Sequence, residues 1–108
     1  MKTQVRALTH GGANIAYDPL GGEYSEQALR ALGTDGVLLI VGFAAGQIPR
    51  LPTNHILLGN RRIVGVDWGG WRTQQPDLQG ALMDELLALA TAGKLHPREP
   101  QAYALADA

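Results

Sequence analysis

The feature that most constrains the fold is an uninterrupted apolar run, Val37 to Val41, with Gly36 before it and Gly42 after it. A strand with one face in water alternates apolar and polar residues, and this run does not alternate. It is typical of a strand covered on both faces, as in a parallel sheet between helix layers, although periodicity alone also allows a buried helical turn. We therefore expect the middle of a parallel sheet here.

Strand-like and helical segments alternate around this run. A short strand is expected at Ala13–Asp18, which ends before a proline, and a helix from about Tyr24 to Leu32. A further strand is expected at Ile63–Trp68, broken by the glycines at 69 and 70. A strand, a helix and a second strand form one unit, for which a right-handed crossover is expected.

Helices are expected at both ends of the chain. Residues 1–8 are interpreted as the last turns of one helix, stopped by a glycine pair. A long helix is expected from Pro76, where proline is favoured in the first turn. An apolar stripe that would pack on the sheet is formed by Leu78, Leu82, Leu86 and Leu89. The order of elements predicts half of a doubly wound α/β fold.

Charge and composition exclude several classes of partner and chemistry. Nine Lys+Arg stand against ten Asp+Glu, and apart from Arg61 and Arg62 the basic residues are scattered, so nucleic acid and anionic membrane are not expected. No apolar stretch approaches the roughly 20 residues that span a bilayer. The chain has no cysteine, and its N-terminus lacks the apolar core of a signal peptide, so a cytoplasmic location is expected.

Metal and nucleophile motifs are missing from the sequence. The three histidines, at positions 10, 55 and 96, show neither of the spacings HxH and HExxH, so no metal site is expected. Ser25 is the one serine of the chain and lies in no GxSxG motif, so we expect it at a helix start and exclude serine hydrolase chemistry.

Four motifs in register point to a known family. They are YDPLGG (17–22), LLIVGFAAGQIPRLPTN (38–54), IVGVDWGGW (63–71) and GKLHP (93–97). In this order and spacing they resemble the second half of the nucleotide-binding domain of the medium-chain dehydrogenase/reductase superfamily, in its NADPH:quinone oxidoreductase branch. The resemblance covers nearly the whole chain and implies a partial doubly wound, Rossmann-like parallel sheet.

The resemblance also implies a cofactor site made of backbone groups. Ligands of open parallel sheets bind outside the carboxyl ends of the strands, and the family holds the nicotinamide carboxamide of NADP there. The matching residues of this chain are Gly42, Phe43, Ala44, Val66, Asp67 and Trp68. From the residue types alone, Gly42 is equally a turn glycine and Trp68 a core or interface aromatic. No catalytic acid or base is expected, because the cofactor carries the chemistry.

The Gly-rich turn that cradles the pyrophosphate belongs to the first half of such a domain. Gly21 and Gly22 are not that turn, because they follow a later strand and no GxGxxG surrounds them. Residues 1–108 are therefore expected to be a partial nucleotide-binding domain, cut on both sides or completed by another chain. Such a chain alone is expected to be inactive and to bind NADP weakly or not at all.

Three charged side chains beside the strands have local interpretations. Asp18 is expected to set the turn at Pro19 through a side-chain oxygen rather than to act as a base or ribose ligand. A contact of Arg61 and Arg62 with the 2′-phosphate of NADP is one interpretation, but charge on an exposed sheet edge, which prevents unwanted pairing, is the preferred one.

The function expected from the resemblance is that of a segment of a zinc-independent, NADP-dependent oxidoreductase acting on a quinone or enone. By resemblance, His55–Leu58 lies at the outer edge of the sheet and pairs with its twofold mate in a homodimer. The alternative is a non-catalytic dimerising or partner-binding half-domain. A weaker third is a methyltransferase-type half-domain, against which the IPRLPTN loop and the VDWGGW segment argue.

Overall fold

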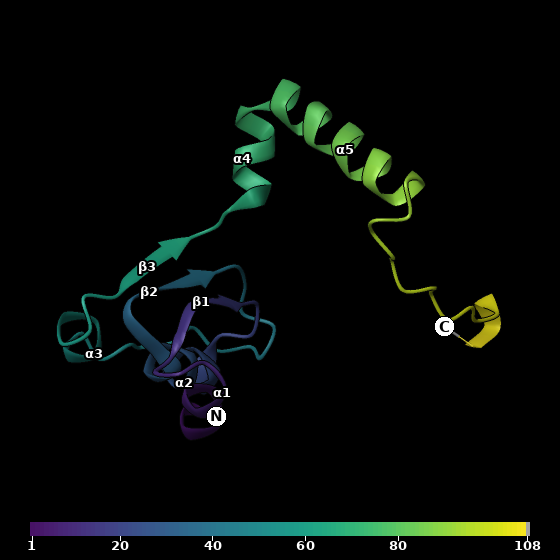
Figure 1. Cartoon of the computed structure of the whole chain (residues 1–108). Coiled ribbons are helices and arrows are strands. Elements are labelled where there is room, and N and C mark those ends of the chain that lie inside the picture. Colours follow the sequence, from purple (N-terminus) through teal and green to yellow (C-terminus); the bar gives the residue numbers. More distant parts are fainter. Residues whose placement is uncertain (108) are drawn as a thin grey trace. The chain divides into compact units, whose positions relative to one another are not determined.

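The computed structural model describes residues 1–107, and the chain divides into two compact units, Met1–Asp67 and Trp68–Ala108. The first unit holds a sheet with its helices (Figure 1). The second holds two helices, α4 and α5, and a short 3-10 turn, η1.

The sheet has three strands, all parallel, in the order β1-β2-β3. The strands are β1 (Ala13–Asp18), β2 (Leu32–Ile40) and β3 (Arg62–Gly65). The apolar run lies in the central strand β2, so the strand prediction is confirmed and the helical alternative is wrong. Asp18 pairs with Ile40, and Ile40 pairs with Gly65, so the carboxyl ends of the three strands meet at one edge.

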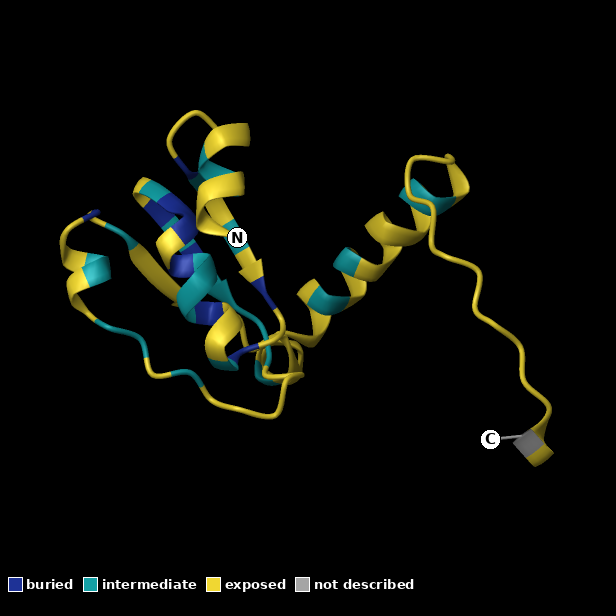
Figure 2. Cartoon of the chain, turned by 90° about the horizontal axis from the view of Figure 1, so that it is seen from below, coloured by how far each residue is buried: buried dark blue, intermediate teal, exposed yellow. Residues whose placement is uncertain are grey.

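The core of the first unit lies between α2 (Gly22–Ala31) and the sheet. Its centre is formed by Leu29, Leu32 and Leu38, none of which exposes any side-chain surface. Figure 2 shows the buried residues gathered on these same elements. On the other face, Ile15 and Tyr17 of β1 are 62% and 67% exposed, so within residues 1–67 one face of the sheet is covered and the other is largely open.

The connection from α2 to β2 is tighter than the sequence predicts. The helix ends at Ala31 and the strand begins with the next residue, so Leu32 lies in β2 and not in the helix expected to reach it. A β-carbon on Gly12, whose φ is +139°, would lie 2.3 Å from the backbone nitrogen of Gly33. The two chain segments therefore pass so closely that a side chain at Gly12 is excluded.

Two expected segments differ from the structure. His55–Leu58 is not an edge strand: Asn54–Leu57 forms the short helix α3, in which the N–H of Leu57 donates to the carbonyl of Thr53 at 3.0 Å. The outer strand is β3, which ends at Gly65, and Trp68 begins the helix α4 (Trp68–Gln74). The glycines at 69 and 70 thus lie inside a helix, because the backbone turns helical directly after Asp67.

The terminal helices agree with the sequence in position. Helix α1 covers Lys2–Leu8, and α5 covers Pro76–Thr91 with its proline in the first turn, as predicted. No residue of α5 is buried, so the packing of its leucine stripe on the sheet stays a prediction. No helix in residues 1–107 is long and apolar enough to cross a membrane.

Candidate functional site

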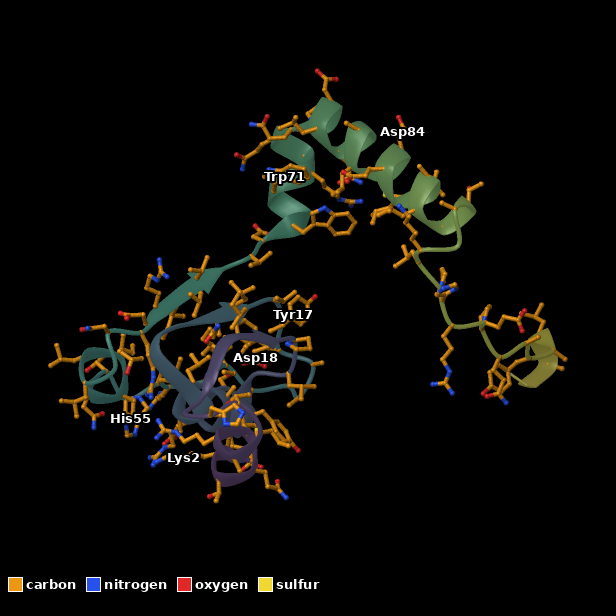
Figure 3. All side chains as sticks on the ribbon, viewed as in Figure 1. Lys2, Tyr17, Asp18, His55, Trp71 and Asp84 are labelled. Carbon is orange, nitrogen blue, oxygen red and sulfur yellow. The ribbon has the colours of Figure 1, made fainter. Side chains whose placement is uncertain are left out.

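The turn after β1 is held by the carboxylate of Asp18, which is only 4% exposed and is labelled in Figure 3. Its Oδ1 accepts hydrogen bonds from the backbone N–H groups of Leu20 at 2.9 Å and Gly21 at 3.0 Å. Its Oδ2 accepts one from the hydroxyl of Ser25 in the first turn of α2. The predicted turn-setting role of Asp18 and the predicted place of Ser25 are both confirmed.

These contacts decide the charge state of Asp18. Burial raises the pKa of the carboxyl, but the hydrogen bonds from Ser25, Gly21 and Leu20 stabilise the charged form, and together they lower its pKa below the ordinary value. Asp18 is therefore ionised at neutral pH and engaged by three donors, which suits a structural carboxylate and not a catalytic base.

The same turn holds the loop that follows β2. The N–H of Ala44 donates to the carbonyl of Pro19 at 3.0 Å, and that of Ala45 to the carbonyl of Leu20 at 2.9 Å. A β-carbon on Gly21, whose φ is +76°, would lie 2.8 Å from a ring carbon of Phe43. The two loops thus form one packed layer at the carboxyl edge of the sheet.

The predicted cofactor residues of the first unit lie at this edge. Gly42 follows β2, and the N–H of Val66 donates to the carbonyl of Ile40 at 2.9 Å, which continues the pairing of β2 and β3. Among residues 1–107, the N–H groups of Gly42 and Phe43 donate to no backbone oxygen. They are the backbone donors that a ligand at this edge can use.

The last two predicted residues follow Val66 directly and lie where the first unit ends and the second begins. Asp67 is the last residue of the first unit, and Trp68 begins α4 in the second. The indole Nε1 of Trp68 donates to Gln79 at 3.1 Å, and the side chain is 49% exposed. Trp68 is therefore not a core aromatic in the described structure.

An open hollow of about 360 Å³ adjoins the loop after β2. It is lined by Gly22, Glu23, Tyr24, Ala45 and Gln47. The N–H of Gly22 donates to the carbonyl of Gln47 at 2.8 Å, which joins the start of α2 to the far end of the loop. The sequence motifs did not single out this hollow, because its lining comes from two segments more than twenty residues apart.

The residues present fit a nicotinamide better than a metal ion. A glycine at the end of the central strand and two adjacent N–H donors suit a flat ring that carries a carboxamide. In residues 1–107 no three side chains among histidine, aspartate and glutamate gather as a metal site requires, and the chain has no cysteine. We therefore derive no role for zinc in this segment.

Arg61 is the residue that sequence reasoning misjudged. Its guanidinium donates to three backbone carbonyls, those of Gly33 at 3.1 Å, His55 at 3.0 Å and Leu32 at 2.7 Å. The interpretation as an exposed edge charge is wrong for Arg61, which is half-buried, whereas Arg62 is exposed on the edge strand β3. Arg61 lies at the amino ends of the strands, the sheet edge opposite to Gly42.

Comparison with known proteins decides the family. The sequence profile described as zinc-binding dehydrogenase matches residues 1–88. This chain belongs to that family, within the medium-chain dehydrogenase/reductases. The resemblance found in the sequence motifs is thereby confirmed, and so is the expectation of a partial doubly wound sheet.

The curated relatives are described as quinone oxidoreductase-like. The chain is 36% identical over 96 residues to a quinone oxidoreductase-like protein 2 homolog of Nematostella vectensis, and 32% identical over 97 residues to the Bos taurus quinone oxidoreductase-like protein 2. These matches cover 88% and 90% of this chain, but only 26% and 28% of the relatives.

Solved structures share the fold at lower identity. A putative NADPH:quinone reductase from Bacillus thuringiensis matches with a TM-score of 0.77 and 21% identity, covering 89% of this chain and 29% of that one. An Etr1p variant in complex with NADP and crotonyl-CoA matches with a TM-score of 0.76 and 21% identity, covering 91% and 28%. The Etr1p/Etr2p heterodimer of Candida tropicalis matches with a TM-score of 0.74 and 21% identity, covering 91% and 28%.

Proposed function

We propose that this chain supplies the nicotinamide-side strand ends of an NADP-dependent oxidoreductase that reduces a quinone or enone. The observation that carries the proposal is the pair of N–H donors at Gly42 and Phe43, placed at the carboxyl edge of the sheet in a member of this family. A fold neighbour in complex with NADP and relatives described as quinone oxidoreductase-like support the choice of cofactor and acceptor.

The contribution of this chain to the reaction is positioning. When bound, the nicotinamide supplies the hydride, so the protein needs to hold and orient the ring. The N–H groups of Gly42 and Phe43 would bind the carboxamide oxygen. The backbone at Gly42 packs closely on the turn after β1, because a β-carbon there would lie 3.3 Å from the carbonyl oxygen of Pro19. The loop that carries Phe43 is kept in place by the turn at Asp18.

We further propose that residues 1–108 alone bind NADPH weakly and show no quinone reductase turnover. No Gly-rich phosphate-binding turn occurs in this sequence, so the pyrophosphate of the cofactor lacks its usual backbone donors and helix dipole. Nicotinamide-side contacts alone leave the dissociation constant at about 1 mM or weaker, that is about -4 kcal/mol. A cytoplasmic location and independence of zinc belong to the same proposal.

An NMR titration of the 108-residue chain with NADPH tests the position of the site. Shift changes are expected at the amides of residues 42–44 and 66–68. A dissociation constant in the micromolar range, about -8 kcal/mol, would show that a pyrophosphate site is present after all. Shift changes restricted to other residues would overturn the assignment of this edge.

A chimera tests the function itself. In it, this chain replaces the matching segment of the Nematostella vectensis relative, whose remaining residues supply the rest of the enzyme. NADPH oxidation in the presence of a quinone is expected. Gly42→Val is expected to abolish it, because its β-carbon would lie 3.3 Å from the carbonyl oxygen of Pro19 and the added side chain would displace the backbone that carries the two donors. Gly80→Ala is the matched control, since a β-carbon there meets nothing within 4 Å. Equal activity of both variants would contradict the proposal.

A dimerising role is the alternative function, and one observation favours it. All four residues of β3 are exposed, and Ile63 and Val64 remain 37% and 43% exposed although β3 pairs with β2. In the described sheet the outer side of β3 is an open apolar edge, which can pair with another chain. We propose β3, and not the helical segment His55–Leu58, as the seam of a homodimer.

Sedimentation at micromolar concentration tests this seam. The chain is expected to be at least dimeric, and Val64→Lys is expected to weaken association because a charge on an edge strand opposes pairing. Lys94→Gln changes a charge outside the first unit and serves as the control. A stable monomer would refute the seam. If the chain is a dimer but the chimera described above does not oxidise NADPH, the non-catalytic alternative is favoured.

A further inference from the structure

A cationic hollow lies at the amino ends of the strands, on the sheet edge opposite to Gly42. It has a volume of about 160 Å³ and is lined by Lys2, Arg6, Arg30, His55, Leu58, Gly59 and Arg61. Four of these residues carry a formal positive charge, and no aspartate or glutamate is among them. Figure 3 shows Lys2 and His55 at the end of the first unit away from Tyr17 and Asp18.

The charges of this hollow are largely uncompensated within the described residues. Arg30 forms an ion pair with Glu26 at 2.6 Å on the exposed side of α2. No such ion pair with a carboxylate in residues 1–107 is formed by Lys2, Arg6 or Arg61. A cluster of like charges that remains unpaired destabilises the fold unless an anion joins it.

Arg6 provides the most specific sign of a missing acceptor. Its Nε atom is buried and has no hydrogen-bond partner in the described structure. Its Nη2 reaches the carbonyl of Leu32 only at 3.4 Å. A buried N–H without an acceptor is destabilising relative to a satisfied one, so a ligand that accepts from Nε would recover this loss.

Arg61 is held in place beside it. Three of its five N–H donors bind the carbonyls of Gly33, His55 and Leu32, which leaves two for a ligand. Burial lowers the pKa of Arg61, and the positive charge of Arg6 lowers it further. The two guanidinium groups therefore repel each other electrostatically. The Arg61 guanidinium is thus fixed before any anion arrives, because three backbone carbonyls hold it.

Capping of α2 explains part of this arrangement. Leu32 follows the last residue of α2, and cations at a helix C-terminus bind its free carbonyls favourably. This accounts for the bonds of Arg61 and Arg6 to Leu32. It does not account for the unsatisfied Nε of Arg6 or for the position of Lys2, which lines the hollow without a hydrogen bond to the helix end in the described residues.

We propose that this hollow binds the phosphate group of a small molecule. The volume corresponds to about five water molecules, which is enough for one phosphate group. Guanidinium groups match phosphate oxygens in geometry, and several cations converging from α1, α2 and the loop before β3 suit a multiply charged tetrahedral anion better than a single carboxylate. The site is independent of the proposed nicotinamide edge.

NMR of the arginine Nε–H groups in the 108-residue chain tests the proposal. The probe is sodium pyrophosphate, added against sodium chloride at equal ionic strength, with inorganic phosphate and glutarate in parallel titrations. Saturable shifts of the Arg6 and Arg61 signals are expected with pyrophosphate and phosphate. Arg6→Gln is expected to weaken pyrophosphate binding about tenfold, the loss of one charge-assisted hydrogen bond.

Two further variants keep the test decisive if Arg6→Gln disturbs the fold. Lys2→Gln alters an exposed lining residue and is expected to weaken binding, whereas Arg62→Gln removes the same charge from the neighbour that does not line the hollow and is expected to leave it unchanged. Equal shifts in sodium chloride, or equal weakening by Lys2→Gln and Arg62→Gln, would overturn the proposal. Tighter binding of glutarate than of pyrophosphate would also overturn it, in favour of a carboxylate.

Discussion

Replacement of Asp18 by alanine is expected to release the layer that carries the candidate cofactor site. The carboxylate accepts from Leu20 N–H, Gly21 N–H and the Ser25 hydroxyl, and alanine leaves all three donors without an acceptor. Each buried donor left unsatisfied costs about 1–3 kcal/mol, and three that share one acceptor group do not add fully. We expect a loss of about 3–5 kcal/mol, a large part of a typical domain stability of about 5–15 kcal/mol.

Two conservative variants separate the contributions to this loss. Asp18→Asn keeps a carbonyl oxygen for the two backbone donors but removes the charge, so a smaller loss of about 1–2 kcal/mol is expected. Ser25→Ala removes one donor and leaves the turn itself, with an expected loss of about 1 kcal/mol. The order of the three losses, with alanine at position 18 the largest, is the result that the geometry requires.

The pH dependence follows from the direction of the pKa shift. Because the pKa of Asp18 is lower in the folded than in the unfolded chain, its contribution to stability is present above the ordinary aspartate pKa of about 3.9. This contribution is lost as the pH falls through the folded pKa. The stability difference between the natural chain and Asp18→Asn should therefore be constant near neutral pH and shrink in acid.

Urea unfolding followed by far-UV circular dichroism measures these losses, and amide hydrogen exchange reports on the site. Exchange of the Ala44 and Ala45 amides is expected to accelerate in Asp18→Ala, because their acceptors are the carbonyls of Pro19 and Leu20 in the same turn. Unchanged protection of these amides, or a loss below about 0.5 kcal/mol, would refute the role of Asp18 as the anchor of this layer.

Three further substitutions test the packing of the described units. Gly12→Ala is expected to destabilise the first unit by more than about 2 kcal/mol in urea unfolding, since its β-carbon would lie 2.3 Å from the backbone nitrogen of Gly33. Gly11→Ala is the control for backbone strain alone, because Gly11 has a φ of +133° and open space around its β-carbon position; it should cost about 1 kcal/mol. Leu38→Ala removes a fully buried side chain of the central strand and should cost about 2–5 kcal/mol, whereas Leu57→Ala, 76% exposed, should change unfolding by less than about 0.5 kcal/mol. Gly80→Ala should raise the stability of α5 by about 1 kcal/mol, seen as slower amide exchange within that helix, and faster exchange would contradict the expected gain in helix propensity.

Much of the fold could be predicted from local patterns. The apolar run of β2 indicates a parallel strand, Asp18 before a proline indicates a side-chain-anchored turn, and Pro76 marks the first turn of α5, all as observed. The expected cover on both faces of that strand is not observed within residues 1–67, where one face of the sheet is largely open. These features depend on the periodicity of apolar residues, on hydrogen bonds from a side chain to backbone groups two or three residues away, and on the fixed φ of proline. The four motifs added the family, which local patterns do not show.

Other features depend on contacts between residues that are far apart in sequence, and only the tertiary structure shows them. His55–Leu58 is expected as a short apolar segment at the sheet edge, but Asn54–Leu57 folds into α3, and Arg61 binds the carbonyl of Leu32, 29 residues away. Three apolar residues in a row are too few for periodicity to separate a helix from a strand, so their partners settle the outcome. The hydrogen-bond partners of an arginine likewise follow from the crossing of segments that are far apart in sequence. The sequence determined the strands and turns, and only the folded chain could bring Lys2, Arg6 and Arg61 together.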